Sequence, residues 1–145
     1  MGQKSGSNAG QMDFLADTTL LIDLWREQRR PGAATAFAQR HPDARIGIPW
    51  VVAGEFLSGG VTALHDPVTL HRFLDGFALV QSDVAIIAEY ATLYATLKRR
   101  GGLIGPNDLW ISACALRHQC PLVTRNTSDF SVCPNLQVID YTAFR

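Results

Sequence analysis

The sequence has few cysteines, no excess of either charge and no long apolar run. Its three cysteines are odd in number and lack CxxC spacing, so we expect neither a disulfide framework nor a zinc knuckle, and a reducing cytoplasm is the simpler setting. Thirteen Lys and Arg residues balance thirteen Asp and Glu residues, so the overall charge does not point to a nucleic-acid partner. No apolar run is long enough to cross a bilayer, and we expect no membrane segment. The four histidines lack the i, i+4 spacing of a helical metal site.

The remaining composition fits one globular domain. The chain has 145 residues, of which 47% are hydrophobic and 18% charged, as expected for a single domain with one core. Residues 1–11 are polar and rich in glycine and serine, and we interpret them as a disordered leader or a remnant of an expression tag. The folded domain is then expected over residues 12–145.

Short apolar strands alternate with helices along the chain. We expect strands at residues 14–16, 45–48, 78–80, 121–124 and 138–139. We expect helices at residues 18–26 and 33–40, from Pro49 to the Gly59-Gly60 pair, at residues 66–74 and 83–100, from Pro106 onward, and a turn or short helix at 126–130. This alternation predicts an α/β fold with a parallel sheet covered by helices on both faces.

One of these helices carries a clear apolar pattern. After Asp83, apolar residues recur with i, i+3, i+4, i+7 spacing, which predicts one buried helix face. The predicted face consists of Val84, Ile87, Ala88, Ala91 and Tyr94. The basic run at residues 98–100 and the Gly101-Gly102 pair predict the end of this helix, with a left-handed C-cap.

Acidic residues stand at the ends of several expected elements. Asp17 directly follows the first strand, where parallel sheets bind ligands, although aspartate is also a favoured N-cap. Asp108 lies in the first turn of its helix, where it also complements the helix dipole. Asp129 follows a strand closely, and an ordinary turn residue is the alternative.

Glu55 has the most informative surroundings of the acids. It is expected to share a helix face with Val51 and Val52. An acid in such an apolar setting is costly unless it pairs with an arginine or binds a cation, and both interpretations stay open. If these carboxylates converge, their repulsion raises their pKa values unless a cation is present. Mg²⁺ or Mn²⁺ suits oxygen ligands, bridges phosphates and activates water for attack on phosphorus.

Four segments together resemble the motifs of PIN domains, and most of all those of VapC toxins of type II toxin–antitoxin pairs. They are FLADTTLLI at 14–22, EFLSG at 55–59, NDLWISA at 107–113 and VTRNTSDF at 123–130. The resemblance covers about residues 12–141 and implies a three-layer α/β/α sandwich with a short, mainly parallel central sheet. It also implies a ribonuclease that depends on Mg²⁺ or Mn²⁺, often cuts tRNA or ribosomal RNA, forms a homodimer and is inhibited by a cognate antitoxin.

The same resemblance implies roles for individual residues. By motif, Asp17, Glu55 and Asp108 carry over as metal-binding acids, and the fourth position is Asn126, Asp129 or both. Thr19 departs from the pattern, because many members have asparagine there. An acidic pocket of this kind also suits an arginine-bearing antitoxin segment whose apolar residues fill a neighbouring groove.

Several polar residues near these motifs have two interpretations. Thr18 and Thr124 are expected either to hydrogen-bond the acids or coordinated water, or to be ordinary turn and strand threonines. Arg125 lies beside the proposed pocket and is the preferred contact for RNA phosphates; Lys98, Arg99, Arg100 and Arg117 are further candidates. Trp50 and Trp110 are expected in the core rather than as platforms for bases.

Two other functions remain as alternatives. A haloacid-dehalogenase-like or receiver-like phosphoryl-transfer protein also places an aspartate after a strand. The former needs a second aspartate two residues after Asp17, where Thr19 stands. A non-catalytic PIN-like module that binds RNA or protein is expected to have lost the acids, which this sequence keeps.

Overall fold

The structure, a computed structural model, describes residues 11–145, so the predicted leader lies outside the described residues except for Gln11. The elements are β1 (Phe14–Ala16), α2 (Thr18–Arg26), α3 (Ala33–Arg40), β2 (Ile46–Pro49), α4 (Trp50–Thr62), α5 (Pro67–Leu74), β3 (Ala78–Val80), α6 (Val84–Arg99), α7 (Pro106–His118), β4 (Leu122–Thr124), α8 (Thr127–Phe130), β5 (Val138–Asp140) and the 3-10 helix η1 (Tyr141–Ala143). None of the helices in this described part is long and apolar enough to cross a membrane.

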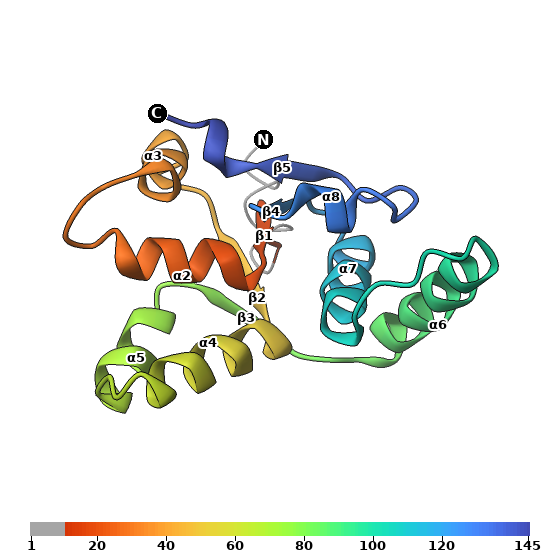
Figure 1. Ribbon diagram of the computed structural model, residues 1–145, viewed down its shortest axis with the longest axis horizontal. Helices are drawn as coiled ribbons and strands as arrows, with labels where there is room; N and C mark the ends of the chain where they lie inside the picture. Colours follow the sequence, from red (N-terminus) through yellow and green to blue (C-terminus); the bar gives the residue numbers. More distant parts are fainter. Residues whose placement is uncertain (1–10) are drawn as a thin grey trace.

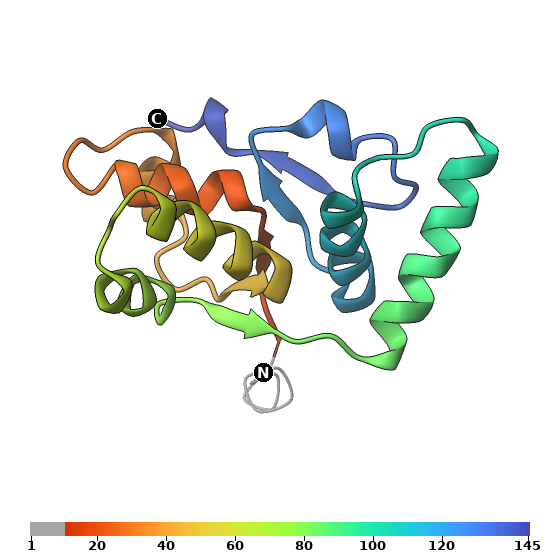
Figure 2. The ribbon, with the colours of Figure 1, turned by 60° about the horizontal axis from the view of Figure 1, so that its bottom comes forward.

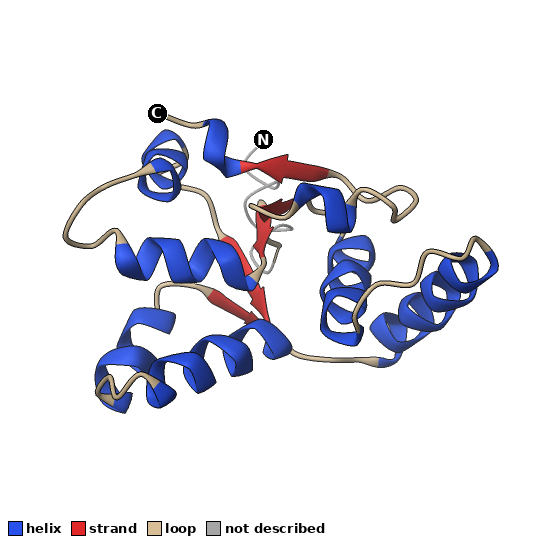
Figure 3. Cartoon of the chain, viewed as in Figure 1, coloured by secondary structure: helices blue, strands red, loops and turns tan. Residues whose placement is uncertain are grey.

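The strands form one parallel sheet in the order β3-β2-β1-β4-β5. Helices α2 to α5 lie to one side of the strands and α6 and α7 to the other, as two views agree (Figures 1 and 2). Figure 3 shows the strands in red between these two groups of helices. The predicted α/β/α architecture with a parallel central sheet is therefore confirmed.

The order of the strands reverses at β1. The chain proceeds from β1 to β2 and β3 on one side, and β4 returns to pair with the other side of β1. In open parallel sheets, ligands bind beyond the carboxyl ends of the strands at such a switch point. The residues that follow β1 and β4 are thus brought to the position where a functional site is expected.

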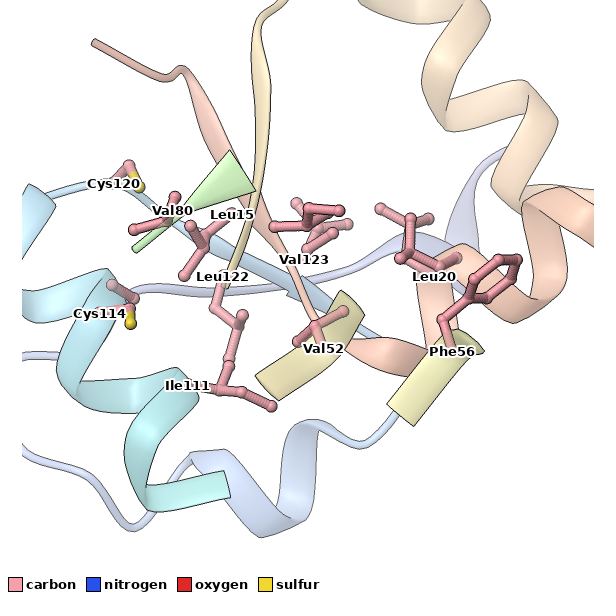
Figure 4. Close-up of a cluster of buried hydrophobic side chains, with 14 of the residues drawn as sticks. Leu15, Leu20, Val52, Phe56, Val80, Ile111, Cys114, Cys120, Leu122 and Val123 are labelled. Atoms are coloured by element: carbon pink, nitrogen blue, oxygen red, sulfur yellow. The ribbon is translucent and has the colours of Figure 1, made fainter. Parts of the chain in front are cut away.

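The core lies around the two central strands (Figure 4). Consecutive residues of β4, Leu122 and Val123, are both fully buried, as is Leu15 of β1. Since successive strand residues point to opposite faces, burial of both means that helices cover both faces of the sheet. Val52 of α4 and Ile111 of α7 pack into the same cluster. Each buried leucine or valine contributes about 1.5–3 kcal/mol to folding.

Helix α4 runs past the glycine pair at which we expected it to end, continuing to Thr62. Gly60 lies against Leu70 of α5, and a Cβ atom on Gly60 would stand 2.6 Å from Leu70 Cδ2. Leu70 is itself fully buried, so Gly60 and Leu70 form part of the packed contact between α4 and α5. The predicted end was wrong because Gly60 serves close packing of two helices and not helix termination.

The predicted buried face of α6 was also wrong. Its buried residues are Ile86, Leu93 and Leu97, whereas Val84 is 83% exposed and Ile87 is 52% exposed. The end of the helix was predicted correctly: Gly101 has a φ of +70° and the Gly102 N–H donates to the Leu97 carbonyl at 2.9 Å. These two features are those of a Schellman C-cap.

The two tryptophans expected in the core pack at its edge. Trp110 stacks on Tyr90 with ring centroids 3.9 Å apart and meets Trp50 edge to face at 5.6 Å. Both tryptophans are partly buried and lie against the main core cluster. Their rings are engaged with one another and with Tyr90, in agreement with a packing role.

Candidate active site

Asp17 lies at the switch point, between the end of β1 and the start of α2. It is the N-cap of α2, since its side chain accepts the Leu20 N–H at 3.3 Å, and it is only 3% exposed. The Thr19 hydroxyl donates to Oδ1 and the Thr124 hydroxyl donates to Oδ2, both at 2.6 Å. Burial raises the pKa of Asp17, and the hydrogen bonds offset only part of this rise. Asp17 is therefore both a helix cap and an acid whose ionisation is opposed by its surroundings.

Glu55 is exposed, so the apolar setting expected from the sequence was wrong. The buried positions of α4 are Val52 and Phe56, and Glu55 stands beside this stripe on the solvent side. Its carboxylate is nevertheless held: the Thr18 hydroxyl donates to Oε1 at 2.5 Å and the Asn107 amide donates to Oε2 at 3.0 Å. These two hydrogen bonds connect the first turns of α2 and α7 to the middle of α4.

Asp108 is half-buried in the first turn of α7. The pKa of Asp108 is raised from 3.8 to about 6, first by burial and then by the negative charges of Asp17, Asp129 and Glu55, in that order. The charges of these three acids therefore act on Asp108, although the four residues are up to 112 residues apart in sequence.

The fourth position of the site contains two exposed candidates on one short segment. Asn126 is the N-cap of α8, and its backbone N–H donates to the Thr124 hydroxyl at 2.9 Å. Asp129 lies one turn further on α8 and is the residue whose charge acts on Asp108. Both side chains therefore come from the segment that follows β4, beside Asp17.

The donor set suits a hard divalent cation. Carboxylate oxygens are the ligands that Mg²⁺ and Mn²⁺ prefer, and Mg²⁺ keeps several waters while using one or two carboxylates. Across residues 11–145, no three His, Cys, Asp or Glu side chains stand close enough to form a ready-made metal group. Mg²⁺ bound to these carboxylates would keep several waters, as it commonly does.

A basic residue borders the acids. Arg125 follows β4, its backbone N–H donates to the Thr19 hydroxyl at 3.1 Å, and its Nη1 lies 2.8 Å from Asp23 Oδ2. Its side chain is 43% exposed. Of the other basic residues considered from the sequence, Lys98 lies over the ring of Tyr94, 5.8 Å from its centroid, at the end of α6.

The expected threonine contacts are present, and two further contacts were not expected. Thr18 and Thr124 hydrogen-bond the acids Glu55 and Asp17. Thr19 and Asn107 do the same, although the sequence offered no reason to select them. The available signal was position alone, because each lies within two residues of a proposed metal ligand.

Comparisons with known proteins identify a family and several relatives. Residues 14–133 match the PIN domain family. Ribonuclease VapC1 of Methanocaldococcus jannaschii is 31% identical over 117 residues, which cover 81% of this chain and 78% of that protein. Ribonuclease VapC1 of Haemophilus influenzae is 25% identical over 134 residues, which cover 90% of this chain and 99% of that protein. The solved structure of VapBC-1 from nontypeable Haemophilus influenzae superposes with a TM-score of 0.77 at 25% identity, over 89% of this chain and 98% of that one.

Proposed function

The chain belongs to the PIN-domain family, which it matches over residues 14–133, and we propose that it is a ribonuclease toxin of the VapC kind. One observation carries the proposal: the charges of Asp17, Asp129 and Glu55 act together on Asp108 where a parallel sheet binds ligands. Such a concentration of carboxylates serves a cation that accompanies substrate phosphates. The relatives named ribonuclease VapC1 support RNA as the substrate class, with tRNA or ribosomal RNA as the targets we expect.

The cation in this proposal is Mg²⁺ or Mn²⁺. Its ligands would be Asp17, Glu55 and Asp108, with Asp129, Asn126 or both at the fourth position. When bound, the cation supplies a water activated for attack on phosphorus and offsets the charge that develops on the phosphate. Burial is the largest cause of the raised pKa of Asp108, and repulsion by the neighbouring carboxylates adds to it; a bound dication would relieve this repulsion, which supports the assignment.

The chain's own residues orient the carboxylates before substrate arrives. Thr19 and Thr124 each direct a hydroxyl hydrogen at one oxygen of Asp17. Thr18 and Asn107 fix the carboxylate of Glu55 in the same way from two different helices. Groups that hold metal ligands in place typically contribute about 10- to 100-fold to metal affinity or activity. Arg125, at the rim, binds an RNA phosphate in this proposal.

A hollow beside Glu55 supports an antitoxin as the protein partner. It has a volume of about 170 Å³ and its apolar walls include Ile22, Trp25, Phe56 and Leu70. A segment that carries an arginine beside apolar side chains would pair with the carboxylates and fill this hollow. The VapBC-1 complex among the similar structures supports the same partner class.

We also propose that the protein is a homodimer. Light scattering coupled to size-exclusion chromatography of the purified chain should give about twice the mass of 15.9 kDa. A monomer at micromolar concentration would contradict this part of the proposal and leave the ribonuclease assignment intact.

The test of the activity is an RNA-degradation assay with and without metal. We expect cleavage with Mg²⁺ or Mn²⁺, none with EDTA, and none with Asp17→Asn or Asp108→Asn. Asp75→Asn is the matched control, because Asp75 is an exposed acid at the end of α5. Cleavage that continues unchanged in EDTA and in both site variants would contradict the proposal.

A further inference from the structure

A polar network joins the rim of the acidic site to the C-terminal part of the chain. Oδ2 of Asp23 lies 2.8 Å from Nη1 of Arg125 and 2.5 Å from the hydroxyl of Tyr141. The same hydroxyl lies 3.1 Å from the carbonyl oxygen of Thr19. Asp23 is on α2, Arg125 follows β4 and Tyr141 begins η1, so three distant segments meet at one carboxylate oxygen.

Exposure increases along this network from the core outward. Tyr141 is 1% exposed, the Asp23 side chain is 18% exposed and the Arg125 side chain is 43% exposed. Burial and the hydrogen bond to Asp23 raise the pKa of Tyr141, so its hydroxyl keeps the proton that it donates. A hydroxyl fixed in the core therefore restrains the carboxylate, and the carboxylate restrains the guanidinium.

The guanidinium of Arg125 is restrained by Asp23 and still has N–H donors that can bind another group. Its backbone is connected to Asp17 through the Thr19 hydroxyl, which accepts the Arg125 N–H and donates to Asp17 Oδ1 at 2.6 Å. A guanidinium has five N–H donors, and Asp23 contacts it at Nη1. The remaining donors form a planar fork suited to a pair of phosphate oxygens.

We propose that Asp23 and Tyr141 are positioning residues that hold Arg125 where it binds a phosphate of the RNA strand next to the cleaved bond. The inference rests on the proposed ribonuclease function and extends it to residues outside the acidic motifs. Asp23 is negative and repels RNA, so its contribution to RNA binding is geometric. It reduces the side-chain freedom that Arg125 loses on contact with phosphate.

The variant Asp23→Asn separates a positioning effect of Asp23 from an effect of its charge, because the two predict opposite changes in RNA affinity. Removal of a negative charge near RNA tightens binding if charge alone matters. Loss of the restraint on Arg125 weakens binding if positioning matters. With a labelled RNA oligonucleotide that the wild type cleaves, we expect the KM to rise about three- to tenfold and kcat to stay near the wild-type value, as when ground-state and transition-state binding are lost equally.

Two further variants test the ends of the network. Tyr141→Phe removes no charge, and we expect KM to rise in the same direction by about twofold, since one hydrogen bond is lost. Arg125→Ala should raise KM at least as much as Asp23→Asn and reduce the slope of log affinity against log salt by about 0.7, the value for one phosphate of a single strand. Tyr94→Phe and Arg29→Ala are the matched controls, because Tyr94 and Arg29 are exposed and lie outside this network. Thermal unfolding of every variant separates loss of fold from loss of contact.

Three results would overturn the inference: tighter or unchanged RNA binding by Asp23→Asn, an unchanged KM for Tyr141→Phe, or an unchanged salt slope for Arg125→Ala. Fluorescence anisotropy with the same oligonucleotide is measured beside cleavage. If the wild type binds the RNA but does not cleave it with Mg²⁺ or Mn²⁺, the proposed function fails. The RNA affinities of the variants relative to the wild type then still test whether Asp23 and Tyr141 position Arg125. If the wild type does not bind RNA, the inference fails as well.

Discussion

The two ends of helix α2 each hold a carboxylate, and their surroundings are opposite. At the C-terminal end, Glu27 accepts the backbone N–H groups of Thr35 at 2.7 Å, Gly32 at 2.9 Å and Ala34 at 3.3 Å. Burial alone would raise the pKa of Glu27, but these hydrogen bonds outweigh it and lower the pKa. At the N-terminal end, Asp17 also has three donors, yet its pKa is raised, because it is far more deeply buried.

The difference shows what makes a carboxylate structural or functional. Glu27 lies beside the start of α3, where the first backbone N–H groups have no partner within the helix. Hydrogen bonds from these N–H groups stabilise the charge of Glu27 within the fold. At the other end of α2, the charges of Asp17, Asp129 and Glu55 act on Asp108, and we propose that a cation offsets this shared negative charge. We expect changes at the first end to alter stability and changes at the second to alter activity.

The largest effect on RNA cleavage is expected from Asp108→Asn. RNA cleavage should fall by more than about a hundredfold, since even residues that only support metal ligands contribute about 10- to 100-fold.

The same variant should change stability. The folded protein binds a proton at Asp108 more tightly than the unfolded chain, so this group's stabilising contribution is full below pH 3.8 and is lost as the pH rises through about 6. In EDTA at pH 7.5, the variant should therefore be more stable than the wild type by about 1 kcal/mol after solvent screening is allowed for.

Chemical unfolding of both proteins in EDTA at pH 4 and pH 7.5 measures this difference. The gain in stability should be present at pH 7.5 and much smaller at pH 4. An equal gain at both pH values would mean that ionisation of Asp108 is not its cause. A loss of stability at pH 7.5 would contradict the proposal that Asp108 is destabilising when it is charged.

The next effect is expected from Thr124→Val, which keeps the shape of a fully buried side chain and removes its hydroxyl. Asp17 loses the donor to Oδ2, so its pKa should rise further and RNA cleavage should fall about 10- to 100-fold. Stability should fall by about 1–3 kcal/mol as a buried acceptor loses its partner. Thr69→Val is the control, because the Thr69 hydroxyl donates to Asp66, an exposed aspartate that is not among the four acids of the site. Similar loss of cleavage in both variants would contradict the assignment.

The opposite end of α2 supplies a third prediction, for Glu27→Ala. Loss of the acceptor at the start of α3 should cost about 1 kcal/mol at neutral pH, as for other N-cap substitutions. A lowered pKa means that the stabilisation is present above the ordinary pKa of 4.5 and is lost as the pH falls through the folded-state value, so wild type and variant should converge in acid. Cleavage by the folded variant should be unchanged. A loss of activity without loss of stability would contradict the comparison.

The sequence was a good guide to the fold where local chemistry decides it. The strand at 14–16, the helix at 18–26 and the Gly101 C-cap were all predicted from short-range signals. In α6, apolar residues occupy two interleaved stripes with helical spacing, and only the contact with α7 determines that Ile86 and not Val84 is buried. Periodicity cannot choose between two such stripes, because the choice depends on tertiary packing.

In the site, too, features set by local sequence were predicted and features set by tertiary contacts were not. Acids that end a strand or begin a helix were selected from position and motif, and the charges of three of them act on the fourth, Asp108. The exposure of Glu55 was missed, because a helix pattern does not show which side of a stripe faces solvent. Asn107 and Tyr141 act through contacts 52 and 118 residues away in the chain, and nothing local marks such partners.

The smallest effect concerns the fourth position of the site, where Asp129→Asn is compared with Asn126→Ala. The charge of Asp129 raises the pKa of Asp108, after burial and Asp17 and ahead of Glu55. Asp129→Asn should therefore lower the pKa of Asp108 in metal-free protein, by less than Asp17→Asn does, whereas Asn126→Ala removes no charge and should leave it unchanged. Titration of the Asp108 carboxyl carbon by NMR measures each shift. If Asp129→Asn leaves the titration unchanged and Asn126→Ala alone reduces cleavage, the fourth metal-binding residue is Asn126, and Asp129 belongs with Glu27 among the structural carboxylates.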